Sequence, residues 1–125
     1  MSDLKTYFNE TEGLGVLSTA DSSGVVNAAI YSRPHVMDDG TLAVIMNDHL
    51  SHDNVLSNPK AHYLFREKDA SGYKGVRLAL TQLREEENTE LLYELCRRCD
   101  DKGKETAKKR FLVFFRVDSQ RPLIG

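Results

Sequence analysis

The apolar residues of this chain fall into short segments, each long enough for a β-strand and each bounded by turn-forming residues. Glycine, serine, asparagine, aspartate and proline separate these segments throughout the first half of the sequence. Extended segments need partners for their backbone hydrogen bonds, so a chain built this way is expected to fold around a sheet. The pattern predicts six strands, over Leu14–Thr19, Val25–Ser32, Thr41–Asn47, Ala61–Arg66, Gly75–Leu83 and Phe111–Val117.

Two short helices are predicted beside the first strands. Asp3 can cap the first, which carries one apolar stripe and ends near Gly13 and Gly15. Ser51 is expected to be the N-cap of the second, which runs from Asp53 to Ser57 and ends at the Asn-Pro pair that follows.

A third and longest helix is predicted between the last two strands, capped by Asn88 or Thr89. Its buried stripe consists of Leu91, Leu92, Leu95, Cys96 and Cys99. The two cysteines form a CxxC pair, which invites a redox or zinc interpretation. Because they share the apolar stripe and no second pair exists, buried apolar cysteines are the preferred interpretation.

Composition limits the class of protein. Of the 125 residues, 40% are hydrophobic and 29% charged, which excludes a disordered chain, and the net charge of −2 gives no general attraction to nucleic acid. No apolar run approaches the roughly 18 residues of a membrane helix, and no secretory signal is visible. Two cysteines are too few for a disulfide scaffold. We therefore expect a single domain, residues 1–125, located in the cytoplasm.

The second predicted strand leads into a cation. Pro34 cannot donate to a central ladder, so the segment Arg33–His35 is expected at an edge or a bend. Arg33 could bind an anionic ligand there, or form a surface ion pair with an acidic neighbour. The small side chains of Val25–Ser32 would let a flat ligand lie against the strand, although they would suit a crowded barrel interior equally well.

A polar segment, His49-Leu-Ser-His-Asp-Asn54, follows the third predicted strand. His49 and His52 could coordinate a metal or a haem. Only Asp53 adds a carboxylate nearby and no further ligand is evident, so no metal site is predicted.

Several features, taken in their order, carry a resemblance to a known family. They are Gly13-Leu-Gly-Val-Leu-Ser-Thr-Ala-Asp21 with its Ser-Ser-Gly turn, the strand that leads to Arg33, the Asp-Gly turn before an apolar strand, the segment from Ser51 to Phe65, and Gly75–Leu95. Together they resemble the pyridoxamine 5'-phosphate oxidase-like, FMN-binding split-barrel proteins, especially the small single-domain members. The resemblance extends from Leu4 to Val117.

This resemblance agrees with the strand pattern, because six twisted strands with short antiparallel connections tend to close into a barrel. The expected fold class is mainly β (α+β), a six-stranded antiparallel split β-barrel of Greek-key type with short flanking helices. The family further implies a homodimer with two FMN molecules at the interface. It assigns the FMN phosphate to Arg33, His35, His49, Ser51, His52 and Asn54. It assigns the flavin ring to Asn27, Ala28, Ala29, Ile30, Ile45, Met46 and Asn47.

The chain departs from the family at two places. Ser51 occupies a position where many relatives carry Lys or Arg, and Val44-Ile45 replaces a Tyr-Thr pair of the oxidases. The expected function is an FMN-binding flavoprotein, a small oxidoreductase of unknown substrate, with no catalytic residue assigned. The alternatives are a non-catalytic flavin- or haem-binding protein of the same fold, and a dimer-forming regulatory domain with an empty site.

Overall fold

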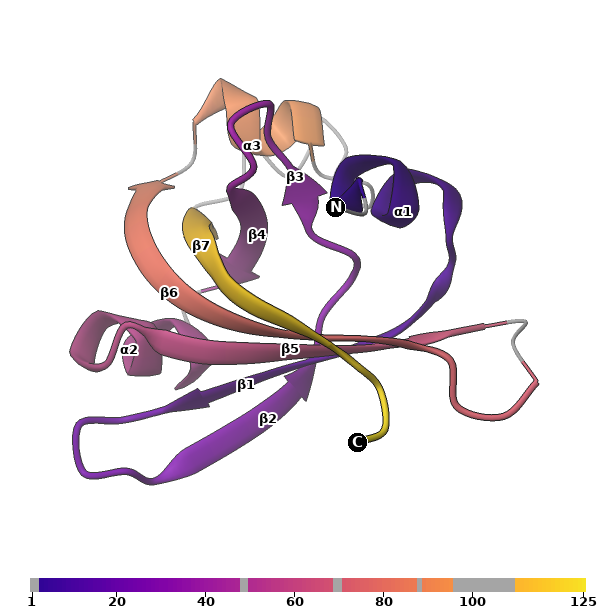
Figure 1. Ribbon diagram of the computed structural model, residues 1–125. Helices are drawn as coiled ribbons and strands as arrows, with labels where there is room; N and C mark the ends of the chain where they lie inside the picture. The colour runs from indigo at the N-terminus through magenta and orange to yellow at the C-terminus, as the bar shows by residue number, and fades with distance from the viewer. Residues whose placement is uncertain (1–2, 48–49, 69–70, 88, 96–109) are drawn as a thin grey trace.

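The computed structural model describes residues 3–47, 50–68, 71–87, 89–95 and 110–125 (Figure 1). The described elements follow the order α1 Leu4–Glu10, β1 Gly13–Ala20, β2 Val26–Ile30, β3 His35–Val36, β4 Leu42–Asn47, α2 Leu50–Ser57, β5 Lys60–Glu67, β6 Gly75–Glu87, α3 Glu90–Leu95 and β7 Arg110–Pro122. None of the described helices has the length and apolar character needed to cross a membrane.

All described strands belong to one antiparallel sheet with the order β2-β1-β5-β6-β7-β4-β3. β5, β6 and β7 are neighbours in sequence order and β4 returns beside β7, which is the Greek-key arrangement that was expected. The number of strands was predicted wrongly, because the sheet has seven. The additional strand is β3, whose His35 and Val36 pair with Ala43 and Leu42. Two residues after a proline carry no alternating pattern from which a strand could be recognised.

The sheet bends strongly but does not close. Among the described residues, β2 pairs only with β1 and β3 only with β4, so both remain edge strands. The bend comes from β6 and β7, which run for 13 residues each and shift register at Ala79/Leu80 and at Gln82/Arg84. Such bulges increase the local twist and let a long strand serve two walls of a barrel. They also explain why both strands extend beyond their predicted ends.

The main core lies on the concave side of the sheet. It combines Phe8 of α1 with inward side chains from most strands, including Leu17, Tyr63, Phe65, Leu78 and Phe115. A smaller cluster lies on the outer side of β4 and β7, where α3 covers them, and consists of Ala43, Leu92, Leu112 and Phe114. Leu91 and Leu95 pack against this cluster, as the predicted stripe required, whereas Cys96 and Cys99 lie outside the described residues.

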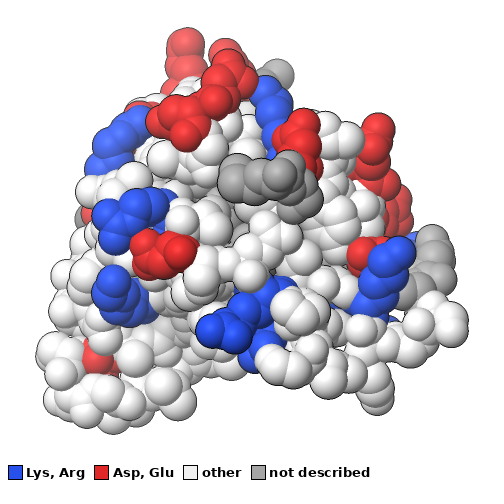
Figure 2. Space-filling view, in the orientation of Figure 1, with Lys and Arg blue, Asp and Glu red and all other residues white. Residues whose placement is uncertain are grey.

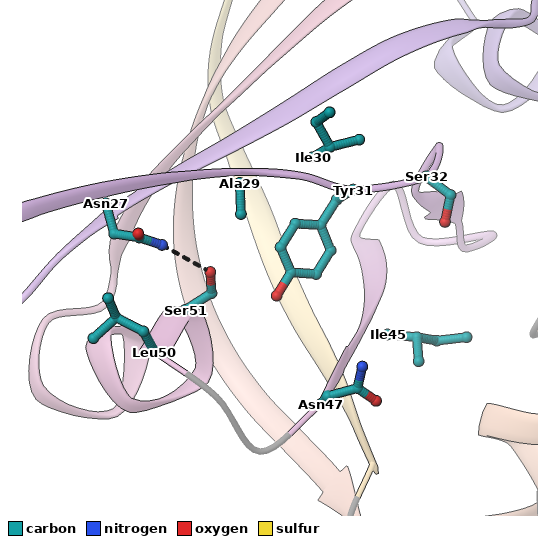
Figure 3. A pocket seen from close by; sticks show the side chains of 9 residues that line it. All are labelled: Asn27, Ala29, Ile30, Tyr31, Ser32, Ile45, Asn47, Leu50 and Ser51. Atoms are coloured by element: carbon teal, nitrogen blue, oxygen red, sulfur yellow. Dashed lines mark hydrogen bonds between the residues drawn. The ribbon is translucent and has the colours of Figure 1, made fainter.

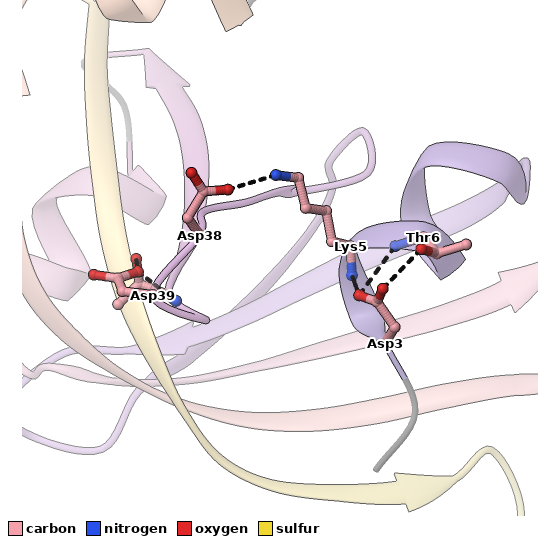
Figure 4. Close-up of polar contacts among 6 residues, drawn as sticks. Asp3, Lys5, Thr6, Asp38 and Asp39 are labelled. Carbon is pink, nitrogen blue, oxygen red and sulfur yellow. Dashed lines mark hydrogen bonds and ion pairs between the residues drawn. The ribbon is translucent and has the colours of Figure 1, made fainter.

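The helix boundaries confirm part of the capping analysis. Asp3 caps α1 by accepting from the backbone N–H groups of Lys5 and Thr6, and Lys5 Nζ lies 2.6 Å from Asp38 Oδ1 in the turn after β3 (Figure 4). Thr89 Oγ1 accepts from Leu92 N at the start of α3.

Two other boundaries were predicted wrongly. Thr11 is the C-cap of α1, and Gly13 and Gly15 belong to β1 rather than ending the helix. α2 begins at Leu50, so Ser51 lies inside the helix instead of capping it. The hydroxyl of Ser51 accepts a hydrogen bond from Asn27 of β2, which is a tertiary contact that local sequence cannot reveal.

Candidate functional site

The free edge of β2 is the starting point of the candidate site. Tyr31 N donates to Gly15 O beyond the last paired residues of the β1–β2 hairpin, so the odd-numbered residues here bond to β1. Because antiparallel ladders alternate, the backbone N–H and C=O groups of Ala28 and Ile30 point away from β1. They therefore face the gap between β2 and the rest of the barrel.

A pocket of about 390 Å³ lies in this gap, between the end of β2, the end of β4 and the first turn of α2 (Figure 3). Its volume falls within the range of small-molecule sites. The described lining contains no charged side chain and consists of Asn27, Ala29, Ile30, Tyr31, Ser32, Ile45, Asn47, Leu50 and Ser51.

Three polar side chains meet on the wall of the pocket. Asn27 Nδ2 donates to Ser51 Oγ at 3.2 Å, and the hydroxyl of Tyr31, the residue after β2, points into the same space (Figure 3). Burial raises the pKa of Tyr31, and the polar side chain of Ser51 partly opposes this rise. The phenol is therefore protonated at neutral pH and able to donate.

The backbone of Tyr31 is fixed by a buried neighbour. Tyr63, which is 1% exposed, donates from its hydroxyl to the carbonyl oxygens of Tyr31 and Ser32, each at 3.3 Å. The space for this hydroxyl exists because residue 15 is glycine. A Cβ atom at Gly15 would lie within 2.6 Å of Tyr31 O and closer still to Tyr63 Oη.

Two further hydrogen bonds join α2 and the residue after it to the β1–β2 hairpin. Asn54 Nδ2 donates to Thr19 Oγ1 at 3.0 Å in a buried position, and Asn58 Nδ2 donates to Asp21 O at 3.4 Å. With the Ser51 contact, these side chains are spaced along one face of the helix and its end. The wall of the pocket formed by β2 is thus attached to α2.

Comparison by sequence finds no match, whereas comparison by structure finds proteins with a similar fold. No protein-family model matches the chain, and no curated protein matches it. An FMN-binding protein from Syntrophomonas wolfei superposes with a TM-score of 0.76 at 20% identity, over 96% of this chain and 83% of the other. HutZ, the heme storage protein of Vibrio cholerae, gives 0.72 at 16%, over 95% and 90%. A candidate pyridoxamine 5'-phosphate oxidase from Lactobacillus delbrueckii gives 0.69 at 14%, over 97% and 93%.

This chain has the pyridoxamine 5'-phosphate oxidase-like split-barrel fold. The fold expected from the sequence is confirmed at this level. The matching split-barrel proteins are named for different ligands. One is described as an FMN-binding protein and another as a heme storage protein.

Many of the residues assigned to the ligand from sequence meet at one place in the split barrel. Those that line the pocket are Asn27, Ala29, Ile30, Ile45, Asn47 and Ser51. The backbone of Ala28 faces the free edge, while its side chain is exposed on the outer face of the sheet. Met46 is fully buried in the core instead of lining the pocket. That these residues bind a cofactor stays a prediction.

The predicted basic residues lie elsewhere. Arg33 Nη1 donates to Phe8 O at 2.8 Å and Thr11 O at 3.1 Å, so its guanidinium group serves carbonyls at the end of α1. His35 is in β3 and does not line the pocket. The possible surface ion pair with Asp38 is taken up by Lys5 instead.

The described residues of the polar segment after β4 belong to α2, and their side chains have different surroundings. His52 is buried against β6 and β7, with Nε2 2.5 Å from Glu85 Oε2 and its ring stacked 3.7 Å from that of Phe111, and it does not line the pocket. Asn54 is buried against Thr19. His49 lies outside the described residues. Within the part of the chain that is described, no group of three or more His, Cys, Asp or Glu side chains is placed to hold a metal ion.

Sequence analysis missed Tyr31, Ser32 and Leu50, which also line the pocket. For Tyr31 a signal was present, because residues two apart on a strand share a face and Tyr31 follows Asn27 and Ala29 in that series. Leu50 had no comparable signal, since its position depends on where α2 begins.

Proposed function

We propose that this chain is an FMN-binding flavoprotein that holds the flavin between β2, β4 and the first turn of α2, and that it acts as a small oxidoreductase. The observation that carries this proposal is the uncharged pocket beside a free strand edge. Unpaired backbone N–H and C=O groups can satisfy the polar edge of a flat ring, while apolar side chains contact its faces. A bound flavin would supply hydride or electron transfer, and the protein would supply binding and orientation.

The described residues fit the ring of FMN better than its phosphate. Ala29, Ile45 and Leu50 offer apolar surface, and Tyr31 and Ser51 offer hydroxyl groups. Among the described lining there is no cation for the phosphate. The first turn of α2 lies at the pocket, and its backbone N–H groups, which have no partner within the helix, form the most favourable place for an anion.

We also propose that the protein is a homodimer. The outer face of β2, β1 and β5 exposes apolar side chains in adjacent positions, since Val16 pairs with Ile30 on one side and with Leu64 on the other. Ile30 is 73% exposed and also lines the pocket. The surface over the β1–β2 hairpin carries few charged side chains (Figure 2). A second copy on this face would cover apolar surface and bring its own residues to the mouth of the pocket.

The proposal is tested by FMN titration of the purified protein, followed through flavin fluorescence and visible absorption. Ala29→Phe places a ring inside the pocket, so we expect FMN binding to be lost. Val25→Phe adds the same ring at an exposed position of the hairpin and serves as the control. Wild-type protein that ignores FMN, or an Ala29→Phe variant that binds it normally, would contradict this site. Loss of the flavin colour on adding a reduced nicotinamide would support an oxidoreductase.

Haem binding is the second candidate, because the heme storage protein HutZ shares the fold. Haem iron needs an axial ligand such as histidine or tyrosine. None of the described histidines lines the pocket, which leaves Tyr31 as the described candidate. A strong absorption band near that of haem proteins after addition of hemin, removed by Ala29→Phe, would favour this function over the flavin.

A further inference from the structure

We propose that the partner subunit's Arg77 supplies the cation that the described lining of the pocket lacks, and that it selects ligands that carry a phosphate. The inference rests on the proposed flavin-binding function and on the proposed homodimer. It differs from the assignment based on the family resemblance, in which residues of the same chain hold the phosphate.

One row of side chains connects the pocket to this arginine across the outer face of the sheet. From β2 to β7, the residues paired along the row are Ile30, Val16, Leu64, Arg77 and Arg121. Ile30 lines the pocket and is also 73% exposed, so the pocket opens at this end of the row. The row is therefore apolar over the three strands next to the pocket and basic over the two strands beyond them.

The basic end of the row has room for an anion. Arg77 and Arg121 lie directly opposite each other, which destabilises a sheet when both residues carry the same charge. The described rows on either side contain no acidic residue and consist of Ala28, Ser18, His62, Ala79 and Ser119, and of Leu14, Arg66 and Gly75. Arg77 donates to Pro122 O at 2.9 Å and to Gly125 O at 2.5 Å. Because a guanidinium group has five N–H donors, it can hold these carbonyls and bind an anion as well.

The charges distinguish between two ways of packing two copies through this face. A two-fold axis at right angles to the strands would stack the row on its own copy, so that Arg77 meets the partner's Arg77. Such a contact between like charges is costly. An axis along β1 instead sets the partner's Leu64 against Ile30 and joins the Val16 side chains of the two copies. The second arrangement buries the apolar residues and keeps the arginines apart.

The second arrangement brings Arg77 of the partner subunit to the mouth of the pocket. Neighbouring strands are about 4.8 Å apart, so β6 of the second copy would lie one strand spacing beyond the free edge of β2. Stacked sheets are about 10 Å apart, a gap that a side chain as long as that of arginine can cross. The guanidinium group would therefore meet the pocket at its Ile30 end.

This position decides where the phosphate is held. Within one chain, the first turn of α2 is the most favourable place for an anion, and it lies at the other end of the pocket beside Asn27 (Figure 3). A helix N-terminus carries roughly half an elementary charge. A guanidinium group carries a whole charge and donates paired hydrogen bonds to a phosphate. The dimer thus favours a phosphate at the mouth of the pocket, with the ring between β2 and α2.

Arg77→Gln removes the charge and keeps a polar side chain. The variant and the wild type are titrated with FMN and with riboflavin, which carry the same ring with and without a phosphate. We expect the affinity for FMN to fall by about 10- to 100-fold, as for the loss of a charge-assisted hydrogen bond. The affinity for riboflavin and the dimeric mass in light scattering should not change. Lys74→Gln, at an exposed position before β6, is the matched control and should alter none of these quantities.

Mixed dimers test which chain supplies the arginine. Ala29→Phe blocks its own pocket and keeps Arg77, whereas Arg77→Gln keeps an open pocket. When equal amounts of the two variants are dissociated and reassociated, about half of the dimers contain one chain of each kind, and each of these has one complete site. We expect these sites to bind FMN with wild-type affinity, although neither variant does so alone. Mixed dimers that are verified by mass spectrometry and lack such sites would overturn the inference.

If Arg77→Gln does not fold, as judged by circular dichroism, the wild-type protein decides the question. Phenylglyoxal modifies accessible arginines, and mass spectrometry follows the reaction at Arg77. We expect FMN to slow this reaction and riboflavin to leave its rate unchanged. Equal rates with the two flavins would overturn the role of Arg77.

The outcomes separate this inference from the function on which it rests. A folded, dimeric Arg77→Gln variant that binds FMN like the wild type would overturn the role of Arg77 and leave flavin binding intact. Equal losses of affinity for both flavins would mean that Arg77 does not serve the phosphate, and would also overturn it. A wild-type protein that binds neither flavin would contradict the proposed function itself.

Discussion

Gly15 occupies a position where β1, the end of β2 and the ring of Tyr63 leave room only for a hydrogen atom. Its neighbours are polar groups that bond to one another, since the Tyr63 hydroxyl reaches the carbonyl of Tyr31 at this point. The glycine is thus needed for a close approach and not for an unusual backbone conformation. It connects a plain sequence feature to the placement of the residue that points into the pocket.

Gly15→Ala is expected to lower the free energy of unfolding by about 1–3 kcal/mol, the usual cost of forcing an extra group into a packed site. The methyl group would push Tyr63 away from Tyr31, so FMN affinity should fall as well. Urea denaturation of the variant measures the first effect. Ser18→Ala, on the same strand, is the control, and an equal denaturation midpoint for the two variants would show that the barrel accommodates the added methyl.

The contacts of Arg33 could not be predicted from its residue type and its position in the sequence. Its charge and its place after a strand suggested an anion ligand, and sequence could not reveal that carbonyls of Phe8 and Thr11 would lie within reach. A helix end leaves several carbonyls without partners, and a nearby guanidinium group is well suited to them. The inward-facing residues of β2 were easier to assign, because strand alternation places them without knowledge of the rest of the fold.

At the scale of elements, α2 determines how far the β1–β2 hairpin stands from β4. Its contacts with the hairpin run from Ser51 through Asn54 to the residue after the helix, and two of them are side chain to side chain. Thr19, the partner of Asn54, is 2% exposed. The hydrogen bond between them therefore lies away from water, where an unpaired polar group is costly.

Asn54→Ala is expected to reduce the free energy of unfolding by about 1–3 kcal/mol, because it leaves the hydroxyl of Thr19 buried without this partner. Chemical denaturation followed by circular dichroism provides the measurement. Leu56→Ala, on the exposed side of the same helix, should cost clearly less. Similar losses in the two variants would mean that α2 holds the hairpin by other contacts.

The elements themselves were predicted well where a repeating pattern was present. All six predicted strands exist, and the burial of side chains alternates along β5 and the first half of β6, as the regular pattern of a strand requires. The ends of β6 and β7 were underestimated because bulges interrupt the pattern while pairing continues. β3 was missed because two residues are too few to form a pattern.

At the scale of the molecule, the outer face of β2, β1 and β5 carries exposed apolar side chains that none of the described helices covers. Val26 is 77% and Leu64 is 37% exposed, and no described helix packs against this side as α3 does on β4 and β7. The sequence indicated which residues alternate, but which of the two faces is covered depends on the order of strands in the sheet. That order is known from the structure, and the strand pattern alone did not give it.

Leu64→Glu is expected to convert the proposed dimer to a monomer, because it places a charge in the middle of this face. Arg77 lies opposite Leu64 on β6, so the new carboxylate has a cross-strand partner and the fold itself should be retained. Light scattering during gel filtration measures the mass. Leu83→Glu, at an exposed position near the far end of β6, is the control. A wild-type protein that is monomeric at high concentration would contradict the dimer.

The sheet leaves one wall of the barrel incomplete, and the pocket lies in that opening. Any molecule seated there would touch β2 on one side and β4 on the other, two strands that share no hydrogen bond in the described ladder. A ligand bound there would bridge the two strands and restrain outward motion of the hairpin. Its departure would then require the hairpin to loosen from α2, so the residence time of the ligand would shorten as local opening of the hairpin becomes more frequent.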